Sequence, residues 1–178
     1  MSDAFGRIIA EQGLDVPAVV ARLHAAGSGR YRGRADIETG NALARLIVWI
    51  AGFPAPGRGV DFEIATTPQG EGHIWARRFG ASKTRSYLTY DSTRGCAVEH
   101  FGPIAIRMGL RMRAEVLTVA VLGASFLGLP LPRLLTPQSA ACEFETPDGG
   151  FGFDISASLP LVGLLIRYQG SFDVPALR

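Results

Sequence analysis

A strict alternation of apolar and polar positions marks residues 104–113. The apolar positions are Ile104, Ile106, Met108, Leu110 and Met112, and the intervening ones hold alanine, glycine or arginine. A period of two is typical of a strand with one face in a core and the other in water. This segment ends a longer stretch, residues 72–113, in which short β-like segments are separated by Gly, Ser, Asp and Pro. The stretch predicts a sheet and carries no diagnostic chemistry.

Comparable patterns predict strands along most of the chain. Around residues 31–37 the apolar positions alternate with arginines and acidic residues, which indicates a solvated outer face. Further strands are expected at about 60–64, 72–79, 84–90, 95–101, 103–110 and 112–121. Three later strands are expected to place Ala140, Cys142, Phe144; Phe151, Phe153, Ile155; and Leu164, Ile166, Tyr168 on their core faces. Gly102–Pro103 and the PDGG sequence at 147–150 predict tight reversals between strands.

Helical periodicity is confined to the first 56 residues. A short amphipathic helix ends at Gly13, a second has Asp15 as its predicted N-cap, and a third is capped by Thr39 or Asn41. The third helix is expected to bury a stripe formed by Leu43, Leu46, Ile47 and Ile50.

About ten strands and two or three N-terminal helices, without βαβ alternation, indicate an α+β fold that is mainly antiparallel β. A sheet of that size must close or fold into two layers to avoid exposed edges. We therefore expect a barrel or strongly curved sheet, with a flat two-layer sandwich as the alternative. The 178 residues are expected to form one domain, with a helical N-terminal part at 1–56 and a β-rich part at 57–178.

Composition adds limits on location and partners. The chain is 47% hydrophobic and 19% charged, and its formal net charge of +2 gives no reason to expect nucleic acid as a partner. The N-terminus lacks the apolar core of a signal peptide, so a cytoplasmic location is expected. Cys96 and Cys142 have no disulfide or CxxC pattern and are expected to be reduced. The longest apolar run, residues 116–131, is too interrupted for a membrane span.

No catalytic, metal or cofactor motif stands out. The three histidines are widely separated, so no metal ligand set is predicted. Ser86 and Ser92 lack the GxSxG sequence of a nucleophile elbow. Glu99 and His100 are neighbours on a strand and point to opposite faces, so they cannot act together in one pocket. We predict no catalytic residues and no cofactor.

One strand face is the best candidate for a binding site. Trp75, Arg77 and Phe79 share it, and aromatic rings beside an arginine could line a pocket for an apolar molecule with an anionic end. The alternative is an ordinary packed layer in which Arg77 pairs with Glu99. The complete set of candidate ligand-binding residues is Trp75, Arg77, Phe79, Glu99, Phe153 and Tyr168.

The segment GLPLPRLL, residues 128–135, is predicted to be a partly exposed lip. Pro130 and Pro132 lack backbone donors, so this segment cannot pair in the middle of a sheet. Its leucines either fold over the open end of the barrel as a lid or present an apolar surface to a membrane or a partner. We favour the lid.

Four motifs resemble those of an uncharacterised bacterial family known as domain of unknown function 4166. They are W-x-R-x-F at Trp75, Arg77 and Phe79; E-x-F-G-P at Glu99, Phe101, Gly102 and Pro103; G-x-P-L-P at Gly128, Pro130, Leu131 and Pro132; and L-P-x-x-G-x-x-x-x-Y-x-G at Leu159, Pro160, Gly163, Tyr168 and Gly170. The resemblance runs from about Tyr31 onward and implies no established activity. Family members resemble stand-alone proteins or domains attached to an oxidoreductase of the saccharopine-dehydrogenase type, which implies an accessory role in the cytosol.

Three classes of function remain open. We expect a non-catalytic module that binds a small, mostly apolar or lipid-like ligand, and a cavity of several hundred Å³ in the barrel would favour it. The first alternative is an interaction or accessory domain associated with an oxidoreductase, which an exposed apolar patch on a filled barrel would favour. The second is an enzyme, which ionisable groups converging in a water-excluding cleft would favour. Peripheral membrane contact is possible, and the sequence does not fix the oligomeric state.

Overall fold

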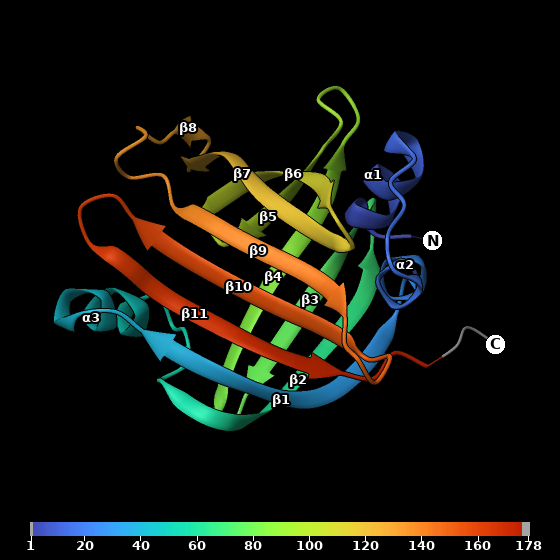
Figure 1. Cartoon of the computed structure of the whole chain (residues 1–178). Coiled ribbons are helices and arrows are strands. Elements are labelled where there is room, and N and C mark those ends of the chain that lie inside the picture. Colours follow the sequence, from blue (N-terminus) through green and yellow to red (C-terminus); the bar gives the residue numbers. More distant parts are fainter. Residues whose placement is uncertain (1, 176–178) are drawn as a thin grey trace.

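An antiparallel sheet that closes on itself dominates the computed structural model, which describes residues 2–175 (Figure 1). Its strands are β1 (Gly29–Thr39), β2 (Gly57–Gln69), β3 (Gly72–Phe79), β4 (Ser82–Asp91), β5 (Cys96–Phe101), β6 (Ile104–Arg113), β7 (Val116–Phe126), β8 (Leu129–Pro130), β9 (Gln138–Glu145), β10 (Phe151–Leu159) and β11 (Gly163–Phe172). They are joined in the order β6-β5-β4-β3-β2-β1-β11-β10-β9-β7, and β7 also pairs with β6. Ten strands therefore close a barrel, and β8 is a short extension beside β7. The predicted barrel is confirmed.

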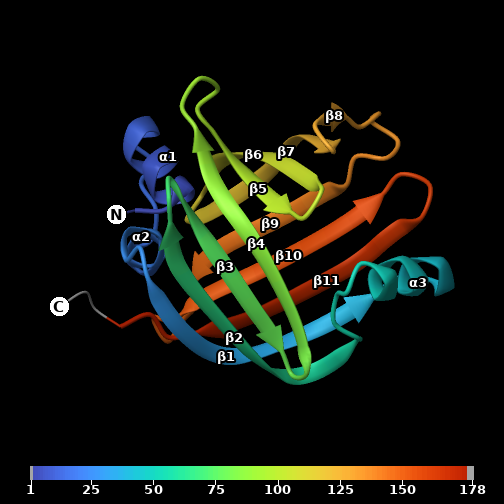
Figure 2. The same ribbon diagram turned by 180° about the vertical axis from the view of Figure 1, so that it is seen from behind.

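The barrel closes through strands that are distant in the sequence. β1 lies between β2 and β11, and Gly33 of β1 stands opposite Phe172 of β11. Gly170 permits this contact, because a Cβ at that position would lie 2.2 Å from the carbonyl oxygen of Arg34. Seen from behind, β2, β3 and β4 run across β9, β10 and β11, so two inclined walls enclose the interior (Figure 2).

The alternation predicted for most strands is observed. On β1, Tyr31, Ala35 and Ile37 are buried, and Arg32 on the outer face bonds to Glu63 of β2. β9 is an exception, because Ala141 and Glu143 are buried and Cys142 and Phe144 are only partly so. The predicted core face of this strand was therefore the wrong one. Both of its faces are rich in small or mixed residues, so a period of two does not identify the inward side.

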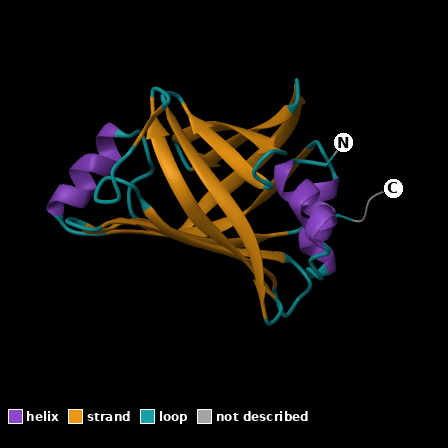
Figure 3. Ribbon diagram, turned by 90° about the horizontal axis from the view of Figure 1, so that it is seen from above, coloured by secondary structure: helices purple, strands orange, loops and turns teal. Residues whose placement is uncertain are grey.

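Two helices close one end of the barrel, which we call the plugged end (Figure 3). They are α1 (Ala4–Gln12), capped by the Asp3 side chain and ended by Gly13 at φ 59°, and α2 (Ala18–Ala25). The predicted N-cap Asp15 was wrong, because α2 begins after Pro17, which has no side-chain hydrogen bond to offer. A proline just before the first helical turn has a fixed φ that suits the start of a helix, and the N–H group that it lacks would have no partner within the helix.

The third helix, α3 (Ala42–Ile50), lies at the opposite end of the barrel (Figures 1 and 3). Asn41 is its N-cap, with its side-chain oxygen 2.9 Å from the amide nitrogen of Ala44. The helix buries Ala44 and Val48 and leaves Leu43, Leu46, Trp49 and Ile50 exposed. The predicted buried stripe was wrong, since only the small face of the helix packs on the barrel.

One turn between strands was predicted correctly, and another was missed. Gly102 and Pro103 join β5 to β6, as predicted. The next reversal falls at Ala114–Glu115, so β6 continues to Arg113 and the boundary predicted near residue 111 was wrong. Ala114 adopts φ 52°, a conformation usually taken by glycine or asparagine, and the sequence therefore gave no signal there.

Candidate functional site

The barrel interior contains a partly enclosed cavity of about 400 Å³. Its walls come from the inner faces of most strands, and nearly all of its surface is aliphatic or aromatic. At the end flanked by α3 and residues 127–137, which we call the mouth, the cavity is narrowed by Ile47, Val48, Leu131 and Leu135. The plugged end is lined by Phe5 of α1 and Leu23 of α2. The cavity is therefore largely apolar, closed by helices at one end and open at the mouth.

All six residues predicted as a ligand site line this cavity. Trp75, Arg77 and Phe79 come from β3, Glu99 from β5, Phe153 from β10 and Tyr168 from β11. The ring of Tyr168 lies edge-on to Phe79, with 5.2 Å between centroids, and Phe153 lies 6.2 Å from Tyr168. The fold thus brings together side chains from both inclined walls.

Arg77 and Glu99 form the polar part of the wall. Arg77 donates from Nη2 to Glu99 Oε1 over 2.9 Å and from Nη1 to Ser86 Oγ over 3.0 Å. Ser86 Oγ donates to the same Glu99 oxygen over 2.6 Å. Within the described part of the chain, no hydrogen bond ends on Glu99 Oε2. Both charged side chains are only 13% exposed, so each neutralises the other in a water-poor setting.

Tyr168 adds a hydroxyl beside this pair. Burial raises its pKa above the usual value, Arg77 lowers it and Glu99 raises it further. The phenol is therefore a neutral donor at physiological pH. The cavity wall consequently offers donors and an acceptor without a net charge at this point.

Trp75 connects the cavity to the plugged end. Its ring stacks on the His24 imidazole with 5.9 Å between centroids, and the Arg77 guanidinium lies 5.3 Å from the ring centroid on β3. Trp75 is 6% exposed, and its Nε1 has no hydrogen-bond partner among residues 2–175. A buried donor without a partner is unusual in a packed wall.

His24 is the centre of a buried ionic cluster that the sequence did not reveal. Its Nδ1 lies 2.9 Å from Asp3 Oδ2 and its Nε2 lies 2.8 Å from Glu143 Oε2. Burial by itself would lower the pKa of His24, but the two carboxylates more than offset this effect and raise the pKa to about 10. The imidazolium ion therefore joins both helices of the plug to β9.

Exposed apolar side chains gather at the mouth. On α3 they are Leu43, Leu46, Trp49 and Ile50. From the end of β7 and the segment after it come Phe126, Leu127, Leu129, Leu134 and Leu135. Ile104 at the start of β6 and Leu161 in the β10–β11 turn complete the set. We call these residues the mouth collar. Of the large hydrophobic side chains exposed between residues 2 and 175, all but Leu122 belong to it.

The predicted lid is only partly observed. Leu131 and Leu135 line the cavity, whereas Leu129 is 73% exposed and Leu134 also faces outward. The segment therefore narrows the mouth with one side and presents an apolar surface with the other.

A family model matches residues 16–172, which include every barrel strand. The family is described as Domain of unknown function (DUF4166). The chain belongs to this family. No curated protein and no solved structure matches it.

The DUF4166 motifs quoted above converge on the cavity. Eight of their side chains line it: Trp75, Arg77, Phe79, Glu99, Phe101, Leu131, Leu159 and Tyr168. Gly102 and Pro103 form the β5–β6 turn, and Gly170 allows β11 to approach β1. The resemblance therefore covers part of the cavity wall and the close contacts that shape it.

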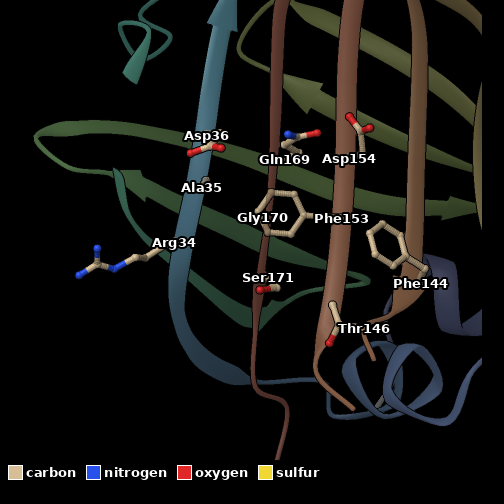
Figure 4. A pocket seen from close by; sticks show the side chains of 10 residues that line it. All are labelled: Arg34, Ala35, Asp36, Phe144, Thr146, Phe153, Asp154, Gln169, Gly170 and Ser171. Atoms are coloured by element: carbon tan, nitrogen blue, oxygen red, sulfur yellow. The ribbon is translucent and has the colours of Figure 1, made fainter. Parts of the chain in front are cut away.

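A second, shallow hollow lies on the outer face of β1, β11, β10 and β9 (Figure 4). Asp36, Gln169 and Asp154 lie along one side of it, and Arg34 extends away from them. Asp154 is already held by two hydrogen bonds from Arg167. This open and mixed surface has no converging set of groups comparable to the interior.

The described residues contain neither a metal-ligand cluster nor a membrane-spanning helix. Nowhere in residues 2–175 do three or more His, Cys, Asp or Glu side chains gather in a way that could hold a metal ion. Within the same range, no helix combines the length and the apolar character needed to cross a bilayer. Cys96 and Cys142 are both free thiols.

Proposed function

We propose that this DUF4166 protein binds a small, mostly apolar molecule inside its barrel. The observation that carries the proposal is the largely apolar cavity of about 400 Å³, whose wall carries the neutral Arg77–Glu99 pair and, toward the plugged end, Glu143 of the His24 cluster. Ligand cavities of roughly 300–1,000 Å³ with few polar groups are typical of small-molecule sites. A filled barrel would need no such space, because protein cores pack almost without voids.

The polar cluster favours a ligand with an uncharged polar end. Arg77 is already paired with Glu99, so an anionic group would approach a carboxylate as closely as a guanidinium. A hydroxyl or carbonyl oxygen can instead accept from Tyr168, and a hydroxyl can also donate to Glu99 Oε2, without an unpaired charge. This inference replaces the anionic ligand end that the sequence alone indicated.

The ionisable groups support binding over catalysis. Arg77 stays protonated and is held by Glu99 and Ser86. Both ring nitrogens of His24 are held by carboxylates, so this residue has no nitrogen left for a substrate. Arg77 and His24 are therefore not available to exchange protons with a bound molecule.

Trp75 fluorescence provides the test. In Trp49→Phe, Trp75 is the sole tryptophan and reports on the cavity. Dodecan-1-ol should change its emission saturably, dodecanoate should bind at least tenfold more weakly, and the protein isolated from its own host should retain an apolar molecule in native mass spectrometry.

Two neighbouring alanines of β9 supply a matched control. Ala141 faces the cavity and Ala140 faces solvent. Ala141→Phe should place an aromatic ring inside the cavity and abolish dodecanol binding, whereas Ala140→Phe should leave binding unchanged. Binding that survives Ala141→Phe, or a wild-type protein that binds none of these probes, would refute the proposal.

A further inference from the structure

We propose that the mouth collar docks onto an anionic phospholipid bilayer, with the barrel mouth facing the lipid. This inference goes beyond ligand binding and stands on observations of the outer surface. The polar interior residues invoked for the ligand, Arg77, Glu99 and Tyr168, take no part in it.

α3 presents the first of these observations. Leu43, Leu46, Trp49 and Ile50 lie on the helix face opposite to Ala44 and Val48, which pack on the barrel. Trp49 is 76% exposed. A surface helix normally turns its apolar face to the core. An apolar face that points outward therefore indicates contact with another apolar surface or with lipid. Tryptophan on such a face is enriched at the boundary between lipid and water.

The segment after β7 provides a second apolar surface at the same mouth. Leu131 and Leu135 point to the cavity that α3 also lines, which places the two surfaces around one opening. Leu129 and Leu134 face outward from this segment, and Leu161 of the β10–β11 turn is 80% exposed. The apolar side chains thus stand on separate projections, an arrangement that a fluid bilayer accommodates without shape complementarity.

The charges of the collar segments select the partner. Residues 40–57, 101–106, 122–139 and 157–166 contain two charged residues, Arg45 and Arg133, and no acidic residue. Both arginines are exposed. The turns at the plugged end contrast with this, because they contain Glu71, Asp91, Arg94, Glu115 and Asp148 and no exposed large hydrophobic residue. Cations beside an apolar face match anionic lipid headgroups.

A second copy of the chain fits this surface less well than a bilayer does. In a symmetric dimer through the collar, Arg45 and Arg133 would meet the same two cations of the other copy, without an acidic partner from the collar segments. Phosphatidylserine headgroups supply the missing negative charge. Docking in this way would bring the cavity opening against the acyl chains, from which an apolar molecule could enter.

Vesicle binding tests the proposal. The wild type should co-sediment with vesicles of phosphatidylcholine and phosphatidylserine, and more weakly with phosphatidylcholine alone. In Trp75→Phe, Trp49 is the sole tryptophan, and its emission should shift to shorter wavelength on these vesicles. Arg45→Gln with Arg133→Gln should weaken binding by about 25-fold, since each arginine near an anionic surface contributes about fivefold. Leu46→Ser with Ile50→Ser should abolish the spectral shift.

The control pair is Arg111→Gln with Arg113→Gln, which removes the same charge from exposed positions outside the collar. These variants should bind vesicles more tightly than the Arg45/Arg133 pair. Equal weakening by both pairs, or no co-sedimentation by the wild type, would overturn the proposal. A dimer that the Leu46/Ile50 variant loses, without vesicle binding, would assign the collar to a second copy. Dodecanol binding by Trp49→Phe remains an independent measure, so failure here does not affect the cavity proposal.

Discussion

His24 should make the protein less stable as the pH becomes alkaline. Its pKa is about 10 in the folded protein and about 6.5 in an unfolded chain. Because the folded pKa is raised, this contribution is fully present below about pH 6.5 and is lost as pH rises toward 10. The free energy of unfolding in urea should therefore fall between pH 7 and pH 10, by at most about 1.4 kcal/mol per pH unit from this group.

The matched control replaces the whole cluster. Asp3→Asn keeps an N-cap for α1, and His24→Leu with Glu143→Leu removes the remaining buried charges. This triple variant should lose the slope assigned to His24. A wild type whose unfolding free energy is constant from pH 7 to pH 10 would show that His24 is neutral in the fold.

Replacement by alanine should lower stability strongly at Arg77 and hardly at all at Arg32. Arg77→Ala leaves Glu99 buried without its partner and should lower the free energy of unfolding by about 3–5 kcal/mol. Arg32 is 72% exposed, and Arg32→Ala should leave stability within experimental error despite its 2.8 Å bond to Glu63. Urea denaturation of the two variants makes the comparison. A small loss in Arg77→Ala would remove Arg77 as an anchor of the wall.

The candidate ligand residues could be found from sequence because strand periodicity fixes which side chains share a face. Trp75, Arg77 and Phe79 belong to one strand, and their common direction follows from the period of two. The cluster of Asp3, His24 and Glu143 could not be found in this way. Its members come from three elements, and only the packing of the plug on β9 brings the carboxylates to the imidazole.

At the scale of elements, the β1–β11 pairing depends on Gly170. A Cβ there would lie 2.2 Å from a backbone oxygen and 3.0 Å from the Phe153 ring. Gly170→Ala should therefore destabilise the protein by about 1–3 kcal/mol. Thermal unfolding, with Gly109→Ala as the control, measures this effect. At Gly109 a Cβ meets only the flexible Leu122 side chain at 3.4 Å, so alanine should be neutral or stabilise by up to about 1 kcal/mol.

If the two alanine variants unfold at the same temperature, the close approach of β11 to β1 is not a determinant of stability. A selective loss in Gly170→Ala would instead explain why a glycine ends the tyrosine-containing DUF4166 motif.

Most elements could be located from sequence, but two faces could not. The helical stripe of α3 has the periodicity of a buried face, and yet Leu46 and Ile50 point outward because the mouth lies beneath the other side of the helix. On β9, Glu143 faces inward because His24 supplies the positive charge that its burial requires. In both cases periodicity identified the element, and a distant partner determined its orientation.

At the scale of the whole molecule, the folded protein should become more stable when a ligand occupies the cavity. A ligand at 100 times its Kd stabilises the folded state by about 2.7 kcal/mol. For a domain of this size, that corresponds to a rise in Tm of about 5–10 °C. Differential scanning calorimetry with dodecan-1-ol should give this shift in the wild type and in Ala140→Phe. Ala141→Phe should give no shift, and an equal shift there would place the binding site outside the cavity.

The closure of the barrel by β1 and β11 has a consequence for how the protein is made. β1 is synthesised before the other ten strands, and its partner segment, residues 166–172 of β11, is synthesised after the rest of them. At about 5–20 residues per second, synthesis of the intervening chain takes roughly 7–30 s. Throughout that interval the outer edge of β1 has no strand to pair with, and unpaired edges recruit other chains. Until the last strand is complete, this edge of β1 is therefore open to pairing with other chains.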